Sequence, residues 1–222
     1  MSIEPEPDAS DAMLTPAEAR VLGCLMEKQR TTPEQYPLTL NGLVSACNQK
    51  SARHPVMSMT PGEVGHVVNR LRDRGLIHAS FSGRTERYDH KMVGTFLISR
   101  EEQALLCALM LRGPQTIGEL RTNTGRLAGF RDLEQVTETL HGMIKRERPL
   151  VVELPRQPGK REERYAHLLC GRPRFEEMAD SGPAPAGEPI RDARIEALEA
   201  EVAGLRAEID RLWSLTGLAD RR

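Results

Sequence analysis

One short pattern occurs twice in this chain, and its repetition constrains the fold more than any other feature. The first copy is GRTERYDH at 83–90, and the second, with one residue inserted, is GKREERYAH at 159–167. Each copy follows a short apolar run, LIHASF or LVVEL, so each has the order strand, glycine-containing turn and returning strand. The sequence therefore predicts two β-hairpins of one kind, anchored by Tyr88 and Tyr165.

Three helices are expected before each hairpin. The first of each set begins with a hydroxyl side chain and a glutamate three positions later, Thr15 with Glu18 and Ser99 with Glu102, which is the capping box of a helix start. Apolar residues then recur at helical spacing in both copies. The second and third helices are predicted in TLNGLVSAC and TPGEVGHVVNRLRDRGLI of the first set, and in TIGELRTNT and LEQVTETLHGMIKRERPLV of the second.

The third helix of each set carries an apolar stripe that should be buried. The stripes are Val64, Val67, Val68 and Leu71 in the first set, and Leu133, Val136, Leu140 and Ile144 in the second. Three helices followed by a hairpin is the order of a winged-helix unit, a variant of the helix-turn-helix. We therefore expect a mainly α fold with small β-hairpins (α+β), built from tandem winged-helix domains at 14–97 and 98–170.

The two ends of the chain differ from the repeated part. Residues 1–13 carry four acids and no base, and are expected to be a disordered tail. Residues 171–190 are rich in proline and small residues and predict a linker. Residues 191–215 carry a heptad stripe that favours a parallel two-stranded coiled coil, while a helix that folds back on its own chain is the alternative. The stripe consists of Ile195, Leu198, Val202, Leu205, Ile209 and Leu212.

Several longer runs resemble one known family. The stretch VLGCLMEKQRTTPEQYPLTLNGLVSACNQKSARHPV, together with RGPQTIGELR and LPRQPGKREERYAHL, is similar to the YceH-like family of bacterial proteins. The resemblance covers about residues 14–170 and implies a cytoplasmic tandem winged-helix protein. It implies no activity and no catalytic site, so the function has to be inferred from the residues themselves.

Composition and motifs narrow the class of function. The chain has a net charge of −1 and no apolar run near the ~20 residues of a membrane helix, so we expect a cytoplasmic protein without a membrane partner. Its four scattered cysteines favour reduced thiols over a disulfide or metal framework. No phosphate-binding glycine loop, HExxH, nucleophile elbow or metal-binding spacing is present. We therefore expect a protein that is not an enzyme and holds no cofactor or metal.

The first repeat carries most of the candidates for nucleic-acid contact. The third helix of a winged-helix unit enters the major groove, where Arg binds phosphate and Asn, Gln, Arg or His reads base edges. The candidates in this helix, in the loop before it and in both hairpins are Asn48, Gln49, Lys50, Arg53, His66, Asn69, Arg70, Arg84, Arg87, Lys160 and Arg161. A plain structural loop and a solvated hairpin are the alternatives, and Asp73 would face phosphate unfavourably.

These features lead to two hypotheses for the function. The first is a non-enzymatic homodimer that binds double-stranded DNA and acts in transcriptional control. The second is an adaptor that recruits other proteins through its winged-helix surfaces and its coiled coil. The exposed face expected for the third helix of the second repeat, with Glu138 and Arg146, is nearly neutral and favours a protein partner for that repeat.

Overall fold

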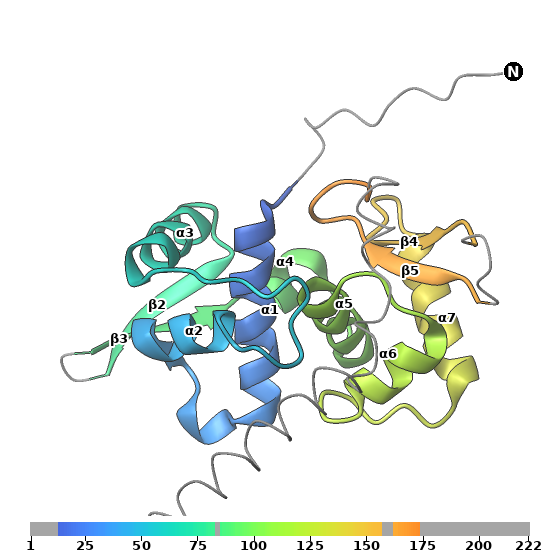
Figure 1. The fold of residues 1–222 in the computed structure, drawn as a ribbon, viewed down its shortest axis with the longest axis horizontal. Helices are drawn as coiled ribbons and strands as arrows, with labels where there is room; N and C mark the ends of the chain where they lie inside the picture. The colour runs from blue at the N-terminus through green and yellow to red at the C-terminus, as the bar shows by residue number, and fades with distance from the viewer. Residues whose placement is uncertain (1–12, 83–84, 157–161, 174–222) are drawn as a thin grey trace, which may run out of the picture. The chain divides into compact units, whose positions relative to one another are not determined.

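The computed structural model of the chain describes residues 13–82, 85–156 and 162–173 as a mixed α+β fold (Figure 1). Its helices are α1 (Pro16–Thr31), the 3-10 turn η2 (Pro33–Gln35), α2 (Leu40–Cys47), α3 (Pro61–Asp73), α4 (Met92–Phe96), α5 (Arg100–Arg112), α6 (Ile117–Thr124) and α7 (Leu133–Ile144). Its strands are β1 (Leu38–Thr39), β2 (Ile77–Ser82), β3 (Thr85–His90), β4 (Val151–Leu154) and β5 (Arg164–His167). No helix within these ranges is long and apolar enough to cross a membrane.

The same order of elements occurs twice, as the sequence repeat predicted. In the first copy α1, β1, α2 and α3 are followed by the antiparallel hairpin β2–β3, and in the second α5, α6 and α7 are followed by β4–β5. Strand β1 pairs with β3, with Leu38 opposite Tyr88, and the second copy keeps this contact as a single bridge between Gln115 and Tyr165. Both tyrosines are buried, which confirms them as anchors of the hairpins. Helix α4, which no sequence pattern indicated, connects the copies.

Capping boxes, in which side chain and backbone bond reciprocally, set where four of the helices begin. In each, a hydroxyl group accepts from the backbone N–H of a glutamate three residues on, and that glutamate accepts from the backbone of the cap residue. These bonds satisfy N–H groups that the first turn of a helix otherwise leaves unpaired. The boxes are Thr15 with Glu18, Thr60 with Glu63, Ser99 with Glu102 and Thr116 with Glu119. Both predicted capping boxes are therefore confirmed.

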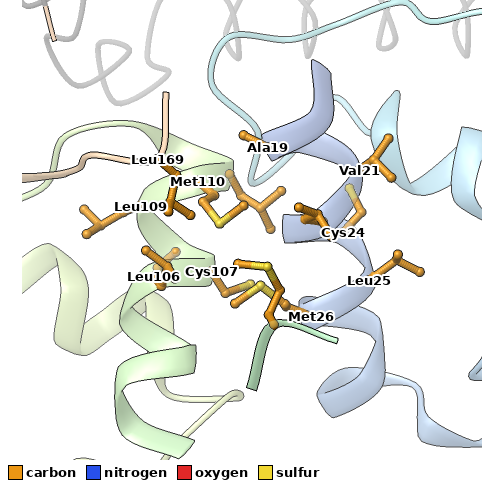
Figure 2. Close-up of a cluster of buried hydrophobic side chains, with 14 of the residues drawn as sticks. Ala19, Val21, Cys24, Leu25, Met26, Leu106, Cys107, Leu109, Met110 and Leu169 are labelled. Carbon is orange, nitrogen blue, oxygen red and sulfur yellow. The ribbon is translucent and has the colours of Figure 1, made fainter. Parts of the chain in front are cut away.

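Helices α1 and α5 pack against each other, and most buried apolar side chains of both copies belong to one hydrophobic core, while Leu154 and Ala166 form a small separate cluster. Figure 2 shows Met26 of α1 and Cys107 and Met110 of α5 in the space between the two helices. Gly23 lets the helices approach closely, because a Cβ at this position would lie only 2.9 Å from Cδ2 of Leu111. The thiol of Cys107 donates a hydrogen bond to the carbonyl oxygen of Gly23 at 3.4 Å.

The buried stripe of α3 is as predicted, but the stripe of α7 is shifted. All four predicted residues of α3 are buried. In α7, Leu133 is 49% exposed because it is the first residue of the helix and lies at its end, whereas Met143 is fully buried. Ile144 is partly buried. The apolar face of α7 therefore begins later along the helix than the spacing predicted.

A polar cluster is buried where β3 meets α1 and α5. Nε2 of His90 lies 3.0 Å from Oε1 of Gln29, and the amide of Gln103 donates to the same oxygen at 3.1 Å. The Tyr36 hydroxyl donates to Asp89 and accepts from the backbone N–H of His90. Burial lowers the pKa of His90 to about 4, so its ring is neutral at pH 7. Gln103 of α5 thus bonds to Gln29 of α1 through uncharged groups, and the cluster joins the two copies.

We expect Gly23→Leu to destabilise the fold, because the new side chain would have to enter the space held by Leu111. Overpacking of this kind costs about 1–3 kcal/mol. The matched control is Gly65→Leu in α3, since a Cβ at Gly65 meets no atom within 4 Å and leucine favours a helix over glycine. Urea unfolding of the two variants checks the prediction, and equal stability would contradict the close contact of α1 with α5.

The free energy of unfolding should fall as the pH drops from neutral to about 5. A histidine in an unfolded chain titrates near 6.5, whereas burial lowers the pKa of His90 to about 4, so the unfolded state binds more protons in this range. His90 should account for roughly 1–2 kcal/mol of this loss, and His167, whose pKa burial also lowers to about 4, should add a similar amount. Chemical unfolding at several pH values should show a smaller loss for His90→Gln, while His66→Gln, at an exposed position, should behave as the unaltered chain. An unchanged pH dependence in His90→Gln would contradict this assignment.

Candidate nucleic-acid interface

Helix α3 presents a polar face to solvent, opposite its buried stripe. Three predicted contact residues, His66, Asn69 and Arg70, are exposed on this helix. In the first turn, Oε2 of Glu63 accepts from the backbone N–H of Thr60 at 2.7 Å and from its hydroxyl at 2.8 Å. These hydrogen bonds lower the pKa of Glu63 and hold its carboxylate against the helix cap. The face therefore offers an imidazole, an amide and a guanidinium group to a ligand.

Two glycines lie in the same half of α3 although no packing requires them. A Cβ at Gly62 or Gly65 would meet no atom within 4 Å. Glycine inside a helix costs about 1 kcal/mol relative to alanine. A hollow of about 590 Å³ adjoins this half of the helix and is lined in part by Met57, Gly62 and His66. Another molecule could therefore approach the backbone of α3 closely at this point.

The arginines at the C-terminal end of α3 are partly neutralised within the fold. Arg70 and Arg74 both lie 3.3 Å from the buried carboxylate of Glu18. Burial raises the pKa of Glu18, but the hydrogen bonds from Thr15 and the two arginines outweigh it and leave this pKa below its ordinary value. The side chain of Arg70 is still 50% exposed, so it can reach a phosphate group.

The corresponding helix of the second copy, α7, has a different exposed face. The N-caps Thr60 and Asp132 define the equivalent positions, and the buried residues Val64 and Val136 then coincide. Helix α3 carries Gly62, Gly65, His66, Asn69, Arg70 and Asp73 where α7 carries Glu134, Thr137, Glu138, His141, Gly142 and Lys145. Carboxylates thus replace glycine and histidine in the first two turns of α7, which makes that half of the helix unsuitable for a polyanion.

Arg53, a predicted contact residue, is buried inside the loop at 48–60. Its guanidinium pairs with both carboxylate oxygens of Glu27, at 2.6 and 3.0 Å, and its Nε donates to the carbonyl oxygen of Ala46 at 3.1 Å. Gln49, another predicted residue, accepts from Arg53 at 2.8 Å. Arg53 therefore fastens the loop to α1 and α2. No sequence pattern indicated this role, because Glu27 is 26 residues away along the chain.

The other predicted residues of this loop have unequal access to solvent. The side-chain amide of Asn48 both donates to the carbonyl oxygen of Met59 and accepts from its backbone N–H, each at 2.7 Å. The loop is also attached to α5, because the backbone N–H of His54 donates to the carbonyl oxygen of Leu111 at 2.8 Å. Lys50, unlike Asn48, is exposed and remains the candidate for phosphate contact in this loop.

The arginine of the repeated hairpin pattern has the same contact in both copies. Arg87 donates to the carbonyl oxygen of Pro37 at 2.8 Å, and Arg164 donates to that of Pro114 at 3.1 Å. Each bond ties the returning strand to the segment just before the second helix of its copy. The recurrence of this arginine in both copies of the hairpin pattern was the sequence feature that could have indicated a structural role for it. Arg84, Lys160, Arg161 and the six heptad residues from Ile195 to Leu212 lie outside the described residues.

Buried arginines and cysteines further limit which side chains of the first copy can contact a ligand. Arg20 is 1% exposed and donates to the carbonyl oxygens of Cys47 and Pro55. Together with the burial of Arg53, this makes the surface of the first copy less basic than its composition indicates. Hydrogen bonding with Cys24, together with burial, raises the pKa of the Cys47 thiol, which is therefore protonated at pH 7. Over the ranges that the structure describes, no three His, Cys, Asp or Glu side chains are placed to hold a metal ion.

Comparison with known proteins finds relatives of uncharacterised function in bacteria. A family model described as "Protein of unknown function, DUF480" matches residues 14–160. A UPF0502 protein of Vibrio atlanticus is 44% identical over 212 residues, which are 92% of this chain and 97% of that protein. A UPF0502 protein of Mesorhizobium japonicum is 47% identical over 202 residues, which are 90% of this chain and 96% of that protein. The similarity covers nearly the whole of each protein.

We expect Arg53→Ala to lower the free energy of unfolding by about 3 kcal/mol, because it removes the buried partner of Glu27 and leaves its carboxylate only the ammonium group of Lys28 at 3.5 Å. Arg53→Lys should also be destabilising, since an ammonium group cannot replace the bidentate pair. The control is Lys50→Ala in the same loop, which should change stability by less than about 0.5 kcal/mol. Urea unfolding distinguishes them. Full stability of Arg53→Ala, combined with a loss of DNA binding, would show instead that Arg53 contacts a ligand.

Proposed function

We propose that this chain, which belongs to the DUF480 family of proteins of unknown function, binds double-stranded DNA through its first repeat and is not an enzyme. The proposal treats each repeat as a winged-helix unit, with α3 as the helix that enters the major groove and β2–β3 as the wing. Its support is the order of elements: a helix, a short strand, two helices and a hairpin to which the short strand is added. We also propose that the protein acts in transcriptional control through this DNA binding.

The single observation that carries the proposal is the exposed face of α3. His66 and Asn69 can form hydrogen bonds with base edges, and Arg70 can bind a phosphate group. Gly62 and Gly65 leave space for the helix backbone to approach the floor of the groove. Lys50, exposed in the loop before α3, would add a second phosphate contact.

Acidic groups near this face limit the affinity that we expect. Asp73 is exposed at the end of α3, and Arg70 shares the carboxylate of Glu18 with Arg74. A surface with phosphate contacts from Lys50 and Arg70 should show a slope of about −2 in a plot of log affinity against log salt concentration. Strong binding that is independent of sequence is therefore not expected from the first repeat alone.

A second candidate function is that of an adaptor, and the exposed face of α7 favours it. Glu134 and Glu138 are exposed there, and Leu133, an apolar residue, is 49% exposed beside them. Such a face suits a protein partner better than a nucleic acid, because the carboxylates repel phosphate. The two functions are compatible, since the two faces belong to different repeats.

We also propose that the protein is a homodimer. The support is the heptad pattern at 191–215, which lies outside the described residues. A dimer would present two copies of α3, and a two-fold arrangement of half-sites on the DNA would match it.

Mobility-shift titration of duplex DNA at two salt concentrations tests the DNA proposal. We expect binding that weakens as salt rises, because neutralised phosphates release counterions. Arg70→Ala and Lys50→Ala should each reduce the affinity and lower the salt slope by about 1. Asp73→Ala should not weaken binding, and Lys145→Ala, at the equivalent position of α7, is the control without effect. Absence of binding at low salt would refute the proposal, and protein partners retained after nuclease treatment would then support the adaptor.

A further inference from the structure

A groove of about 960 Å³ lies between the end of α4, the end of α7 and strand β4. Its lining is mainly apolar and includes Phe96, Leu97, Ile144, Leu150 and Val152. We refer to it as the Leu97 groove. None of these residues belongs to the exposed face of α3, so the groove is a separate surface, and its interpretation does not depend on DNA binding.

Leu97 is held in an unfavourable conformation at the edge of this groove. Its φ of 50° and ψ of 48° lie in the left-handed region, which a leucine rarely adopts because its Cβ crowds the backbone. Its side chain is 81% exposed, so the strain is not compensated by burial of the leucine in the described fold. Backbone strain of this kind occurs preferentially at sites where a ligand or partner binds.

Arg146 maintains this conformation from the end of α7. Its Nη1 donates to the carbonyl oxygen of Phe96 at 2.7 Å, and its Nη2 donates to that of Leu97 at 3.1 Å. The same guanidinium forms an ion pair with Glu102 at 2.8 Å. The position of Arg146 thus differs from the exposed face that the sequence predicted. Its contacts fix the peptide groups before and after Leu97, and they keep this residue at the groove.

The charged side chains that line the groove are mostly positive. They are Arg146, Arg148 and Arg172, with a single carboxylate, Glu147. Arg146 is neutralised by Glu102, whereas Arg148 and Arg172 are exposed. Carboxylates of a partner would therefore be attracted to this rim, and ammonium groups would be repelled.

We propose that the Leu97 groove binds an acidic amphipathic helix of a partner protein. Such a helix presents apolar side chains at i, i+3, i+4 and i+7 along one face, and this face would cover Leu97 and the apolar lining. Carboxylates beside the apolar face would meet Arg148 and Arg172. Leu97 is exposed and its backbone is held by Arg146, so a partner that buries it would gain about 1.5–3 kcal/mol from its apolar surface.

The test uses the full chain and two fluorescent peptides of roughly 18 residues, about five helical turns. Both peptides carry the same leucine stripe, and the remaining positions are glutamate in one and lysine in the other. Fluorescence anisotropy should show roughly tenfold tighter binding of the glutamate peptide. Leu97→Ser should weaken its binding by roughly tenfold or more, and Arg148→Glu should reduce the difference between the peptides. Val56→Ser, at an apolar residue of the loop 48–60 that is 58% exposed, is the control and should bind as the unaltered chain does.

A second variant separates binding from folding. Leu97→Gly removes the left-handed strain, so it should raise Tm by about 2–4 °C while it weakens binding of the glutamate peptide as Leu97→Ser does. A more stable protein that binds less cannot be explained by misfolding.

Four outcomes would overturn the proposal. The first is that the glutamate peptide fails to bind below millimolar concentration, and the second is that both peptides bind equally. The third is that Val56→Ser weakens binding as much as Leu97→Ser does. The fourth is that Leu97→Ser abolishes self-association and leaves peptide binding intact, which would assign the groove to a second copy of this chain.

Discussion

The packing of α1 against α5 at Gly23 is the contact on which the rest of the described structure depends. Because Gly23 has no side chain, Leu111 and Met110 lie directly against the backbone of α1. Each of the two helices also contacts the other helices and the hairpin of its own copy, so most buried apolar side chains of both copies form one core. Small units bury only a limited share of their apolar surface, and a shared core reduces this disadvantage.

This arrangement also decides which polar groups reach solvent. The loop at 48–60 is bonded to α5 through His54 and to α1 through Arg53, so its arginine lies inside while Lys50 lies outside. A buried arginine that is paired with a carboxylate holds the fold together and is not available to a phosphate group. The surface that the proposed function makes available to DNA is consequently smaller than the number of basic residues suggests. It depends mainly on the polar groups and the glycines of α3.

The two copies have kept one framework and have diverged on their exposed faces. Arg87 and Arg164 form the same bond to a proline carbonyl oxygen, and Tyr88 and Tyr165 are both buried. In contrast, Glu138 occupies the position in α7 that His66 occupies in α3. The Leu97 groove belongs to neither copy alone, because its lining comes from the α4 connection and from the second repeat. A nucleic-acid surface on one copy and a protein surface beside the other would give the duplication a function.

The sequence by itself determined the starts of the helices, the two hairpins and the membership of an uncharacterised family. These features depend on short patterns: a capping box spans four residues, and a buried stripe such as Val64 to Leu71 repeats every helical turn. The burial of Met143, the short helix α4 and the roles of Arg53 and Arg146 were decided only by the tertiary structure. Arg53 meets Glu27 across 26 residues, and Arg146 meets Glu102 across 44. A local pattern does not encode which distant group will become the partner of an arginine, so it could not distinguish an arginine that faces solvent from one that holds the fold together.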